Sequence, residues 1–102
     1  VLAARRVERL EALSADLPDA LAVECDITSP DGPQHLIDAT VDHYGRLDVL
    51  INNAGILRDK TLLKMNEEMW DVVIAVHLKG TFACTFAAAA QMKAQGEGGA
   101  II

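Results

Sequence analysis

The sequence predicts an α/β fold, a parallel sheet with flanking helices. Short apolar runs alternate with helical patterns along the 102 residues, as in chains built from β-α-β units. Residues 47–52 are apolar almost throughout, which is typical of a parallel strand covered on both faces. The composition agrees, because 51% hydrophobic and 24% charged residues are ordinary for a globular domain and wrong for disorder.

The first half of the chain predicts two strands, each followed by a helix. Residues 1–4 read as the end of a strand, and residues 5–17 carry apolar side chains at helical spacing. Residues 20–26 predict the second strand. The helix after it should be capped by Ser29 and should end at Gly45, because glycine readily adopts the left-handed conformation found there.

The second half predicts a third strand at residues 47–52, a long helix over 67–94 and a fourth strand from Ala100. Asn66 is expected to cap the long helix. That helix is apolar around most of its circumference, so it should be buried on more than one side. Two alternatives stay open: one side packs against a partner subunit in a homo-oligomer, or the helix is buried within its own domain.

Charge and cysteine content exclude several classes of protein. The net charge is −6 and no basic patch is present, which argues against nucleic-acid binding. The longest apolar stretch, residues 81–90, is too short and alanine-rich to cross a bilayer, so we expect no membrane partner. Cys25 and Cys84 have no metal-ligand spacing; we expect two buried thiols, no metal and a cytoplasmic location.

Residues suited to a nucleotide follow each predicted strand. In open parallel sheets, ligands bind beyond the carboxyl ends of the strands. Arg5 and Arg6 follow the first strand and suit a phosphate. Asp26 and Ile27 follow the second, and the small turn at residues 52–55 follows the third and lets backbone approach a ring or ribose.

The runs INNAG, CDIT and WDVVIAVHLKGTF resemble the short-chain dehydrogenase/reductase family along essentially the whole chain. The resemblance implies a partial Rossmann fold, from the family's second strand to the start of its fifth. Both ends of the chain then read as cuts inside a larger domain. The family's phosphate-binding motif TGxxxGxG would precede Val1, and the catalytic Ser and Tyr-x-x-x-Lys would follow Ile102. Tyr44 is no substitute, because Asp48 stands four residues later.

The resemblance also implies a cofactor site. Asp26 corresponds to the acidic residue that holds the adenine amino group, with Ile27 against the ring; the alternative is a solvated residue leading into a helix. Residues Asn53, Ala54 and Gly55 match the turn along the adenine-side ribose, and Val76 matches a further cofactor contact. The alternative for this turn is a purely structural role, which is favoured for Asn52.

The cofactor should be NADP(H) rather than NAD(H). NAD-preferring members carry an acidic residue at the position of Ala4, where it bonds the ribose 2′-hydroxyl. Here Arg5 follows directly and suits a 2′-phosphate, with Arg6 in support. The alternative is two solvated arginines in the first turn of a helix.

The only catalytic position in this chain is His77, where most family members have Asn in support of the proton relay. A histidine there is similar to the hydroxyacyl-CoA dehydrogenase unit of peroxisomal multifunctional enzymes. The alternative is a histidine that is buried and hydrogen-bonded without a catalytic part. The segment GILRDKTLLKM resembles 3-oxoacyl-carrier-protein reductases and 3-hydroxyacyl-CoA dehydrogenases, and Arg58 and Asp59 fit that subgroup. This resemblance is our only indication of substrate.

The intact protein is therefore expected to interconvert a carbonyl and a secondary alcohol with NADP(H), with a 3-oxoacyl thioester as the favoured small-molecule substrate. The chain of residues 1–102 is expected to be inactive alone, because it lacks the general acid and the pyrophosphate cradle. Two rivals remain: a non-catalytic α/β nucleotide-binding or interaction module, and another Rossmann-like enzyme such as a methyltransferase.

Overall fold

Strands and helices alternate along the chain in the computed structural model, which describes residues 1–102. The predicted α/β class is confirmed, and every predicted strand and helix is present, although the strands are shorter than expected. In chain order the elements are β1 (Leu2–Ala4), α1 (Val7–Ser14), β2 (Ala22–Glu24), α2 (Gly32–Tyr44), β3 (Val49–Leu50), the 3₁₀ helix η1 (Leu62–Lys64), α3 (Glu67–Ile74), the π-helical turn η2 (Ala75–Gly80), α4 (Thr81–Gln95) and β4 (Ala100–Ile101).

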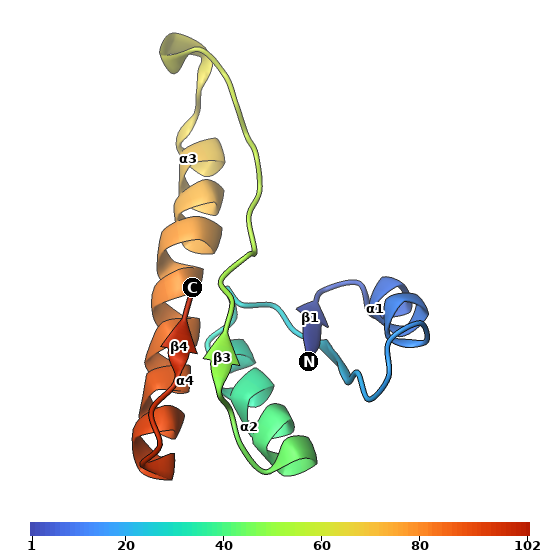
Figure 1. Ribbon diagram of the computed structural model, residues 1–102. Helices are drawn as coiled ribbons and strands as arrows, with labels where there is room; N and C mark the ends of the chain where they lie inside the picture. Colours follow the sequence, from blue (N-terminus) through green and yellow to red (C-terminus); the bar gives the residue numbers. More distant parts are fainter.

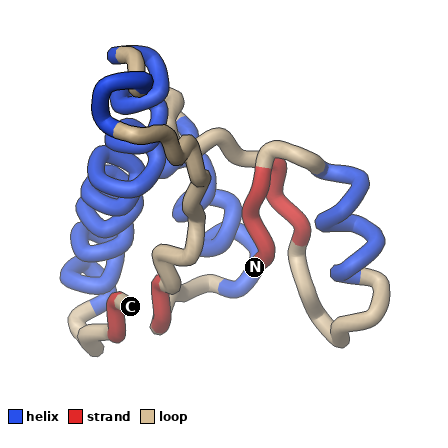
Figure 2. The backbone as a smooth tube through the Cα atoms, turned by 90° about the horizontal axis from the view of Figure 1, so that it is seen from above, coloured by secondary structure: helices blue, strands red, loops and turns tan.

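The strands form two parallel pairs. β1 pairs with β2, and β3 pairs with β4, so each strand has a single neighbour. Figure 2 shows the two pairs as separate units, with α1 on one side of the molecule and the long helix on the other. A residue counts as strand only where a neighbouring strand bonds to it. The strands are therefore shorter than the apolar runs that predicted them.

The core lies where α2 and α4 pack together and Leu50 of β3 packs with them (Figure 1). Ala88 is fully buried at 0% exposure, and small side chains along α4 allow the two helices to approach closely. The buried cluster consists of Ile37, Leu47, Leu50, Cys84, Ala87, Ala88 and Met92. α1 packs separately on β1 and β2.

The predicted end of α2 is confirmed, but its predicted beginning is not. α2 ends at Gly45 as predicted; this glycine has φ +79° and donates its N–H to the Val41 carbonyl at 2.7 Å. The beginning predicted at Ser29 is wrong, because the helix starts at Gly32 with Asp31 as N-cap. Ser29 instead belongs to the turn before the helix, where its Oγ accepts from the Gly32 N–H at 3.0 Å.

The long helix is not the single regular helix predicted for residues 67–94. The π-helical turn η2 separates α3 from α4. Thr81 Oγ1 donates to the His77 carbonyl at 2.7 Å, within this wider turn. The helix is apolar around most of its circumference, so a π turn that rotates the following residues leaves no visible mark in its hydrophobic pattern. The predicted cap is confirmed: Asn66 Oδ1 accepts from the Met69 N–H at 2.9 Å.

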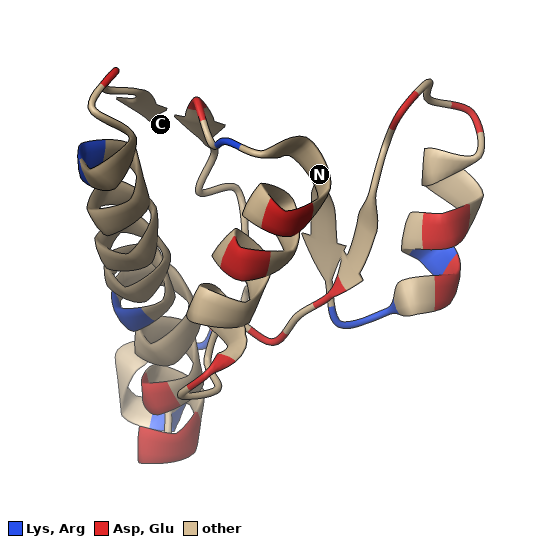
Figure 3. Cartoon of the chain, turned by 90° about the horizontal axis from the view of Figure 1, so that it is seen from below, with Lys and Arg blue, Asp and Glu red and all other residues tan.

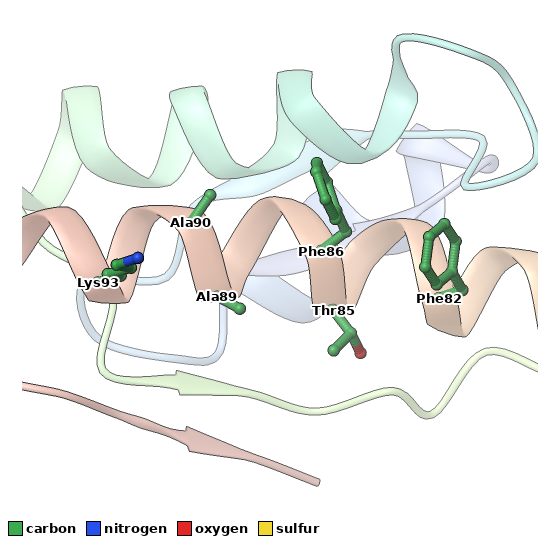
Figure 4. A pocket seen from close by; sticks show the side chains of 6 residues that line it. All are labelled: Phe82, Thr85, Phe86, Ala89, Ala90 and Lys93. Carbon is green, nitrogen blue, oxygen red and sulfur yellow. The ribbon is translucent and has the colours of Figure 1, made fainter.

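The two sides of α4 differ in burial. Cys84, Ala87 and Met92 face the core, whereas Phe82 and Phe86 on the opposite side are 67% and 69% exposed. Figure 4 shows this outer side, a shallow pocket of about 360 Å³ lined by Phe82, Thr85, Phe86, Ala89, Ala90 and Lys93. By length and composition the helix from Glu67 to Gln95 is long and apolar enough to cross a membrane. A single such helix is weak evidence, since core helices of soluble proteins meet the same criteria.

The prediction of two buried free thiols is confirmed for Cys25 and Cys84. Burial raises the pKa of both thiols above the ordinary value, and for Cys25 the neighbouring Cys84 and Asp26 add to the effect. Both cysteines therefore stay protonated at neutral pH and act as small apolar side chains.

Candidate functional site

The ends of β1 and β2 bring Arg5 and Asp26 to one edge of their sheet. Ala4 and Glu24 are partners in the parallel register, and the Cys25 N–H donates to the Ala4 carbonyl at 3.0 Å. Arg5 directly follows β1, and Asp26 stands two residues after the end of β2. Figure 3 shows the same arrangement, with a basic stretch leaving β1 beside an acidic stretch at the end of β2.

The Asp26 carboxylate is ionised and partly committed to hydrogen bonds within its own turn. Its Oδ1 accepts from the Thr28 backbone N–H at 2.9 Å and from Thr28 Oγ1 at 2.7 Å. These two bonds lower the pKa of Asp26 below its ordinary value. Partial burial opposes them, and the positive charge of Arg5 makes the smallest contribution, also lowering the pKa. Asp26 is thus an acceptor-only group within electrostatic reach of Arg5.

A compact network holds the backbone of the turn that carries Asp26. Ser29 Oγ donates to the Asp26 carbonyl at 2.8 Å and accepts from the Gly32 N–H at 3.0 Å. A Cβ added at Gly32 would lie 2.1 Å from the Asp26 carbonyl oxygen, so only glycine fits there. The turn therefore has one arrangement, and Asp26 is fixed in it at both backbone and side chain.

Ile27 connects this turn to the long helix. It is half-buried against the core cluster. A Cβ at Gly80 would lie 2.7 Å from Ile27 Cδ1, so the glycine at the end of η2 provides the space that Ile27 occupies. The residue predicted to lie against a ring is thereby positioned by the helix that also carries His77.

The turn after β3 is open to solvent, and hydrogen bonds of Asn52 hold its first residue in place. Asn53, Ala54 and Gly55 are all exposed. Asn52 has the structural role favoured for it: its N–H donates to the Ile102 carbonyl at 2.7 Å and its Nδ2 donates to Thr85 Oγ1 at 3.3 Å. These bonds tie the end of β3 to β4 and α4, and leave the three following residues accessible.

His77 holds the same turn from the π-helical segment. Its Nε2 lies 3.0 Å from the Ile56 backbone nitrogen and 2.7 Å from the Ile56 carbonyl oxygen. A single ring nitrogen serves one of these partners at a time: unprotonated it accepts from the N–H, and protonated it donates to the carbonyl. A Cβ at Gly55 would lie 2.8 Å from His77 Cε1, so the loop passes directly over the imidazole. The side chain is exposed, unlike the buried histidine of the alternative interpretation.

Comparison with known proteins decides the family. A sequence profile described as short chain dehydrogenase matches residues 1–102. The chain belongs to the short-chain dehydrogenase family.

Individual short-chain dehydrogenases and reductases match over most of the chain. An uncharacterized oxidoreductase of Mycobacterium bovis is 53% identical over 79 residues, 78% of this chain and 32% of that protein. A 3-oxoacyl-[acyl-carrier-protein] reductase of Staphylococcus aureus is 42% identical over 93 residues, 91% of this chain and 37% of that protein. The solved structure of a short chain dehydrogenase from Mycobacterium smegmatis matches with TM-score 0.92 and 36% identity, over 97% of this chain and 43% of that one.

These likenesses confirm the predicted Rossmann-type fold of the short-chain dehydrogenases for the elements present here. The chain spans about a third of the length of the curated relatives it matches. Within the dehydrogenase fold, this chain supplies the segments after β1 and β2 and the loop after β3. Hydrogen bonds within the chain set the geometry of the segment after β2 and of the loop.

Two further groups of predicted residues lie around this site. Arg6 is exposed at the N-cap of α1, and Val76 is half-buried in η2 beside His77. Arg58 donates to the Leu57 carbonyl at 2.8 Å, and Asp59 makes no ion pair with it. Both line a pocket of about 170 Å³ between the loop and α3, whose other lining residues are Ile56, Leu57, Met65, Met69, Trp70 and Val73.

Three residues that shape this site, Thr28, Gly32 and Gly80, were not predicted from the sequence. Thr28 had a local signal, because Asp-x-Thr is a pattern in which the carboxylate bonds the backbone two residues ahead. Gly32 and Gly80 had none, since each is required by a neighbour that is distant in the sequence or brought close only by the turn.

Proposed function

We propose that the intact protein is an NADP(H)-dependent oxidoreductase that interconverts a carbonyl and a secondary alcohol. The observation that carries the proposal is the placing of an exposed arginine and an ionised, oriented carboxylate at adjoining strand ends, Arg5 after β1 and Asp26 after β2. An adenosine 2′-phosphate needs a cation for its phosphate and an acceptor for its exocyclic amine. Membership in the short-chain dehydrogenase family supports this assignment.

The residues of this chain fit the adenine half of such a cofactor. Asp26 Oδ2 has no protein partner and would accept from the adenine amino group, with Ile27 against the ring. Arg5, supported by Arg6, would bind the 2′-phosphate, and the exposed turn at residues 53–55 would run along the ribose. When bound, the nicotinamide supplies the hydride, while the protein binds and orients it.

The substrate class we propose is a 3-oxoacyl thioester. The 3-oxoacyl-[acyl-carrier-protein] reductase of Staphylococcus aureus supports it, with 42% identity over 91% of this chain. The Arg58–Asp59 pair, which resembles that subgroup, lines an apolar pocket next to the cofactor loop. We further propose a cytoplasmic location, which the two free thiols support.

We also propose that residues 1–102 are part of a larger domain and do not catalyse the reaction alone. Val49 in β3 and Ile51 directly after it are 50% and 63% exposed, although an apolar parallel strand of this kind is ordinarily covered on both faces. The radius of gyration is 15.2 Å, above the value of about 13 Å expected for a compact domain of this length. The exposed apolar surface is suited to covering by further strands and helices.

A steady-state assay tests the proposed function. The intact protein should oxidise NADPH with a short 3-oxoacyl thioester, with a turnover number on the order of 1–10³ s⁻¹. Residues 1–102 alone should show no turnover, and NADPH oxidation by this piece would overturn the claim of inactivity. NADPH binding without turnover by the intact protein would favour a non-catalytic nucleotide-binding module. Absence of NADPH binding would contradict the proposal as a whole.

We propose, finally, that the outer side of the long helix forms a homo-oligomer interface. Leu78, Phe82 and Phe86 are each about two-thirds exposed, and Phe82 and Phe86 lie 6.1 Å apart between ring centroids (Figure 4). Contiguous apolar surface of this kind is rare on monomers and typical of interfaces. The flanking alanines allow a second helix to approach closely.

Light scattering on the intact protein tests the interface. We expect an oligomer at micromolar concentration, and dissociation on Phe86→Glu, because a buried unpaired carboxylate costs several kcal/mol, roughly. Leu13→Glu is the matched control, since Leu13 is an exposed leucine of α1, on the other side of the molecule. A wild-type monomer, or equal effects of the two substitutions, would count against the assignment.

A further inference from the structure

Thr28 occupies one of the two carboxylate oxygens of Asp26. Its backbone N–H and its hydroxyl both donate to Oδ1, at 2.9 and 2.7 Å. Two donors on one oxygen fix the plane of the carboxylate and leave Oδ2 as the oxygen without a protein partner. Because Thr28 is exposed and makes no other side-chain hydrogen bond, its hydroxyl has no role in the core.

The backbone beneath this arrangement is equally constrained. The Ser29 N–H and hydroxyl both donate to the Asp26 carbonyl, at 3.1 and 2.8 Å. Gly32 packs against the same carbonyl oxygen at a distance that excludes a side chain. With the backbone held, the Asp26 side chain could still rotate about its χ angles. The two hydrogen bonds from Thr28 prevent that rotation.

A fixed, ionised carboxylate distinguishes purine bases by what they carry at position 6. A carboxylate accepts hydrogen bonds only. A 6-amino group donates a hydrogen bond to the carboxylate. A 6-oxo group is itself an acceptor, so its oxygen and the carboxylate oxygen face each other without a hydrogen bond. A carboxylate free to rotate would turn away from the 6-oxo group and into water, and so discriminate less.

We propose that Thr28 is a positioning residue that sets the preference of this site for a 6-amino purine over a 6-oxo purine, by holding Asp26 Oδ1 and directing Oδ2 at the base. The inference rests on the proposed function, because it requires a purine dinucleotide at this strand edge. The Thr28 bonds also keep the pKa of Asp26 low, so the carboxylate stays in its acceptor-only form across the neutral range.

Equilibrium binding of two dinucleotides tests the proposal. The probes are NADPH and reduced nicotinamide hypoxanthine dinucleotide phosphate. The analogue has an oxo group in place of the 6-amino group and carries a proton on N1, and the two molecules are otherwise identical. We expect wild-type intact protein to bind NADPH about 10-fold or more tightly than the hypoxanthine analogue. Thr28→Val keeps the shape and the backbone N–H but removes the hydroxyl, and should lower that ratio to about 2–3. Thr28→Ser retains the hydroxyl and should keep the wild-type ratio.

The ratio separates positioning from a structural role. If Thr28→Val weakens both dinucleotides equally, or leaves the ratio unchanged, the proposal is overturned while the proposed function stands. A wild-type protein that binds NADPH without preferring it overturns the proposal in the same way. A wild-type protein that binds neither dinucleotide overturns both. Thr28→Ala, which also lacks the hydroxyl but is smaller, gives a second measurement of the ratio that must agree with Thr28→Val.

Discussion

Replacing Arg5 by alanine should weaken NADPH binding by the intact protein about 10- to 100-fold and leave NADH binding within about twofold of wild type. A hydrogen bond between a guanidinium and a phosphate contributes about 1.5–3 kcal/mol. NADH has no 2′-phosphate, so its binding does not include this bond and should not depend on Arg5. Arg5 is exposed directly after β1 and forms no salt bridge, although Asp26 lies within electrostatic reach of it. Fluorescence titration of the two reduced cofactors gives both dissociation constants.

Arg9 provides the matched control, because it is also an exposed arginine but lies within α1. Arg9→Ala should change both dissociation constants by less than about twofold, which separates a local contact from a general loss of positive charge. Arg5→Lys should give an intermediate NADPH affinity, since a lysine keeps the charge and loses the planar pair of donors. Equal weakening of NADPH and NADH by Arg5→Ala would rule out a 2′-phosphate contact.

Replacing His77 by alanine should weaken NADPH binding about tenfold, by releasing the loop along the ribose. The imidazole Nε2 lies within hydrogen-bond distance of both backbone groups of Ile56, and the ring lies directly under Gly55. Its removal leaves these groups without a protein partner and opens space beneath the loop. Titration with NADPH, with hydrogen exchange at residues 53–56 as a second reading, checks the effect on both affinity and loop order.

His77→Asn tests whether hydrogen bonding to the Ile56 backbone is enough to hold the loop. An asparagine amide has an acceptor and a donor, so it serves the Ile56 N–H and carbonyl together, where His77 Nε2 serves one at a time. We expect NADPH affinity and loop protection within about twofold of wild type in this variant. If His77→Asn loosens the loop as much as His77→Ala does, the side chain does more than hold the Ile56 backbone.

Local patterns predicted the elements of this chain well. Gly45 ended its helix because a left-handed residue is needed there, and Asn66 capped the next one because its amide reaches a free N–H. The strand-end positions of Arg5 and Asp26 followed from the alternation of elements and the rule that parallel strands share an edge. Each of these features depends on residues that are close in sequence or on the fold class alone.

What the sequence did not reveal depends on contacts between distant segments. The π-helical turn at residues 75–80 lies in a helix that is apolar on most sides, so the hydrophobic pattern does not reveal it. This turn carries His77 to Ile56. Gly80 is small because Ile27, which is more than fifty positions earlier in the chain, occupies the space beside it. Neither contact has a signature in the residues themselves, since both arise only when the loop, the turn and the helix meet.

The central claim is that the edge formed by Arg5, Asp26 and the turn at residues 53–55 binds the adenosine half of NADP(H). A crystal structure of the intact protein with NADPH tests this most directly. The account predicts the adenine amino group within hydrogen-bond distance of Asp26 Oδ2 and the 2′-phosphate on the Arg5 guanidinium. A cofactor whose adenine lies elsewhere, or whose 2′-phosphate makes no contact with Arg5, would contradict it.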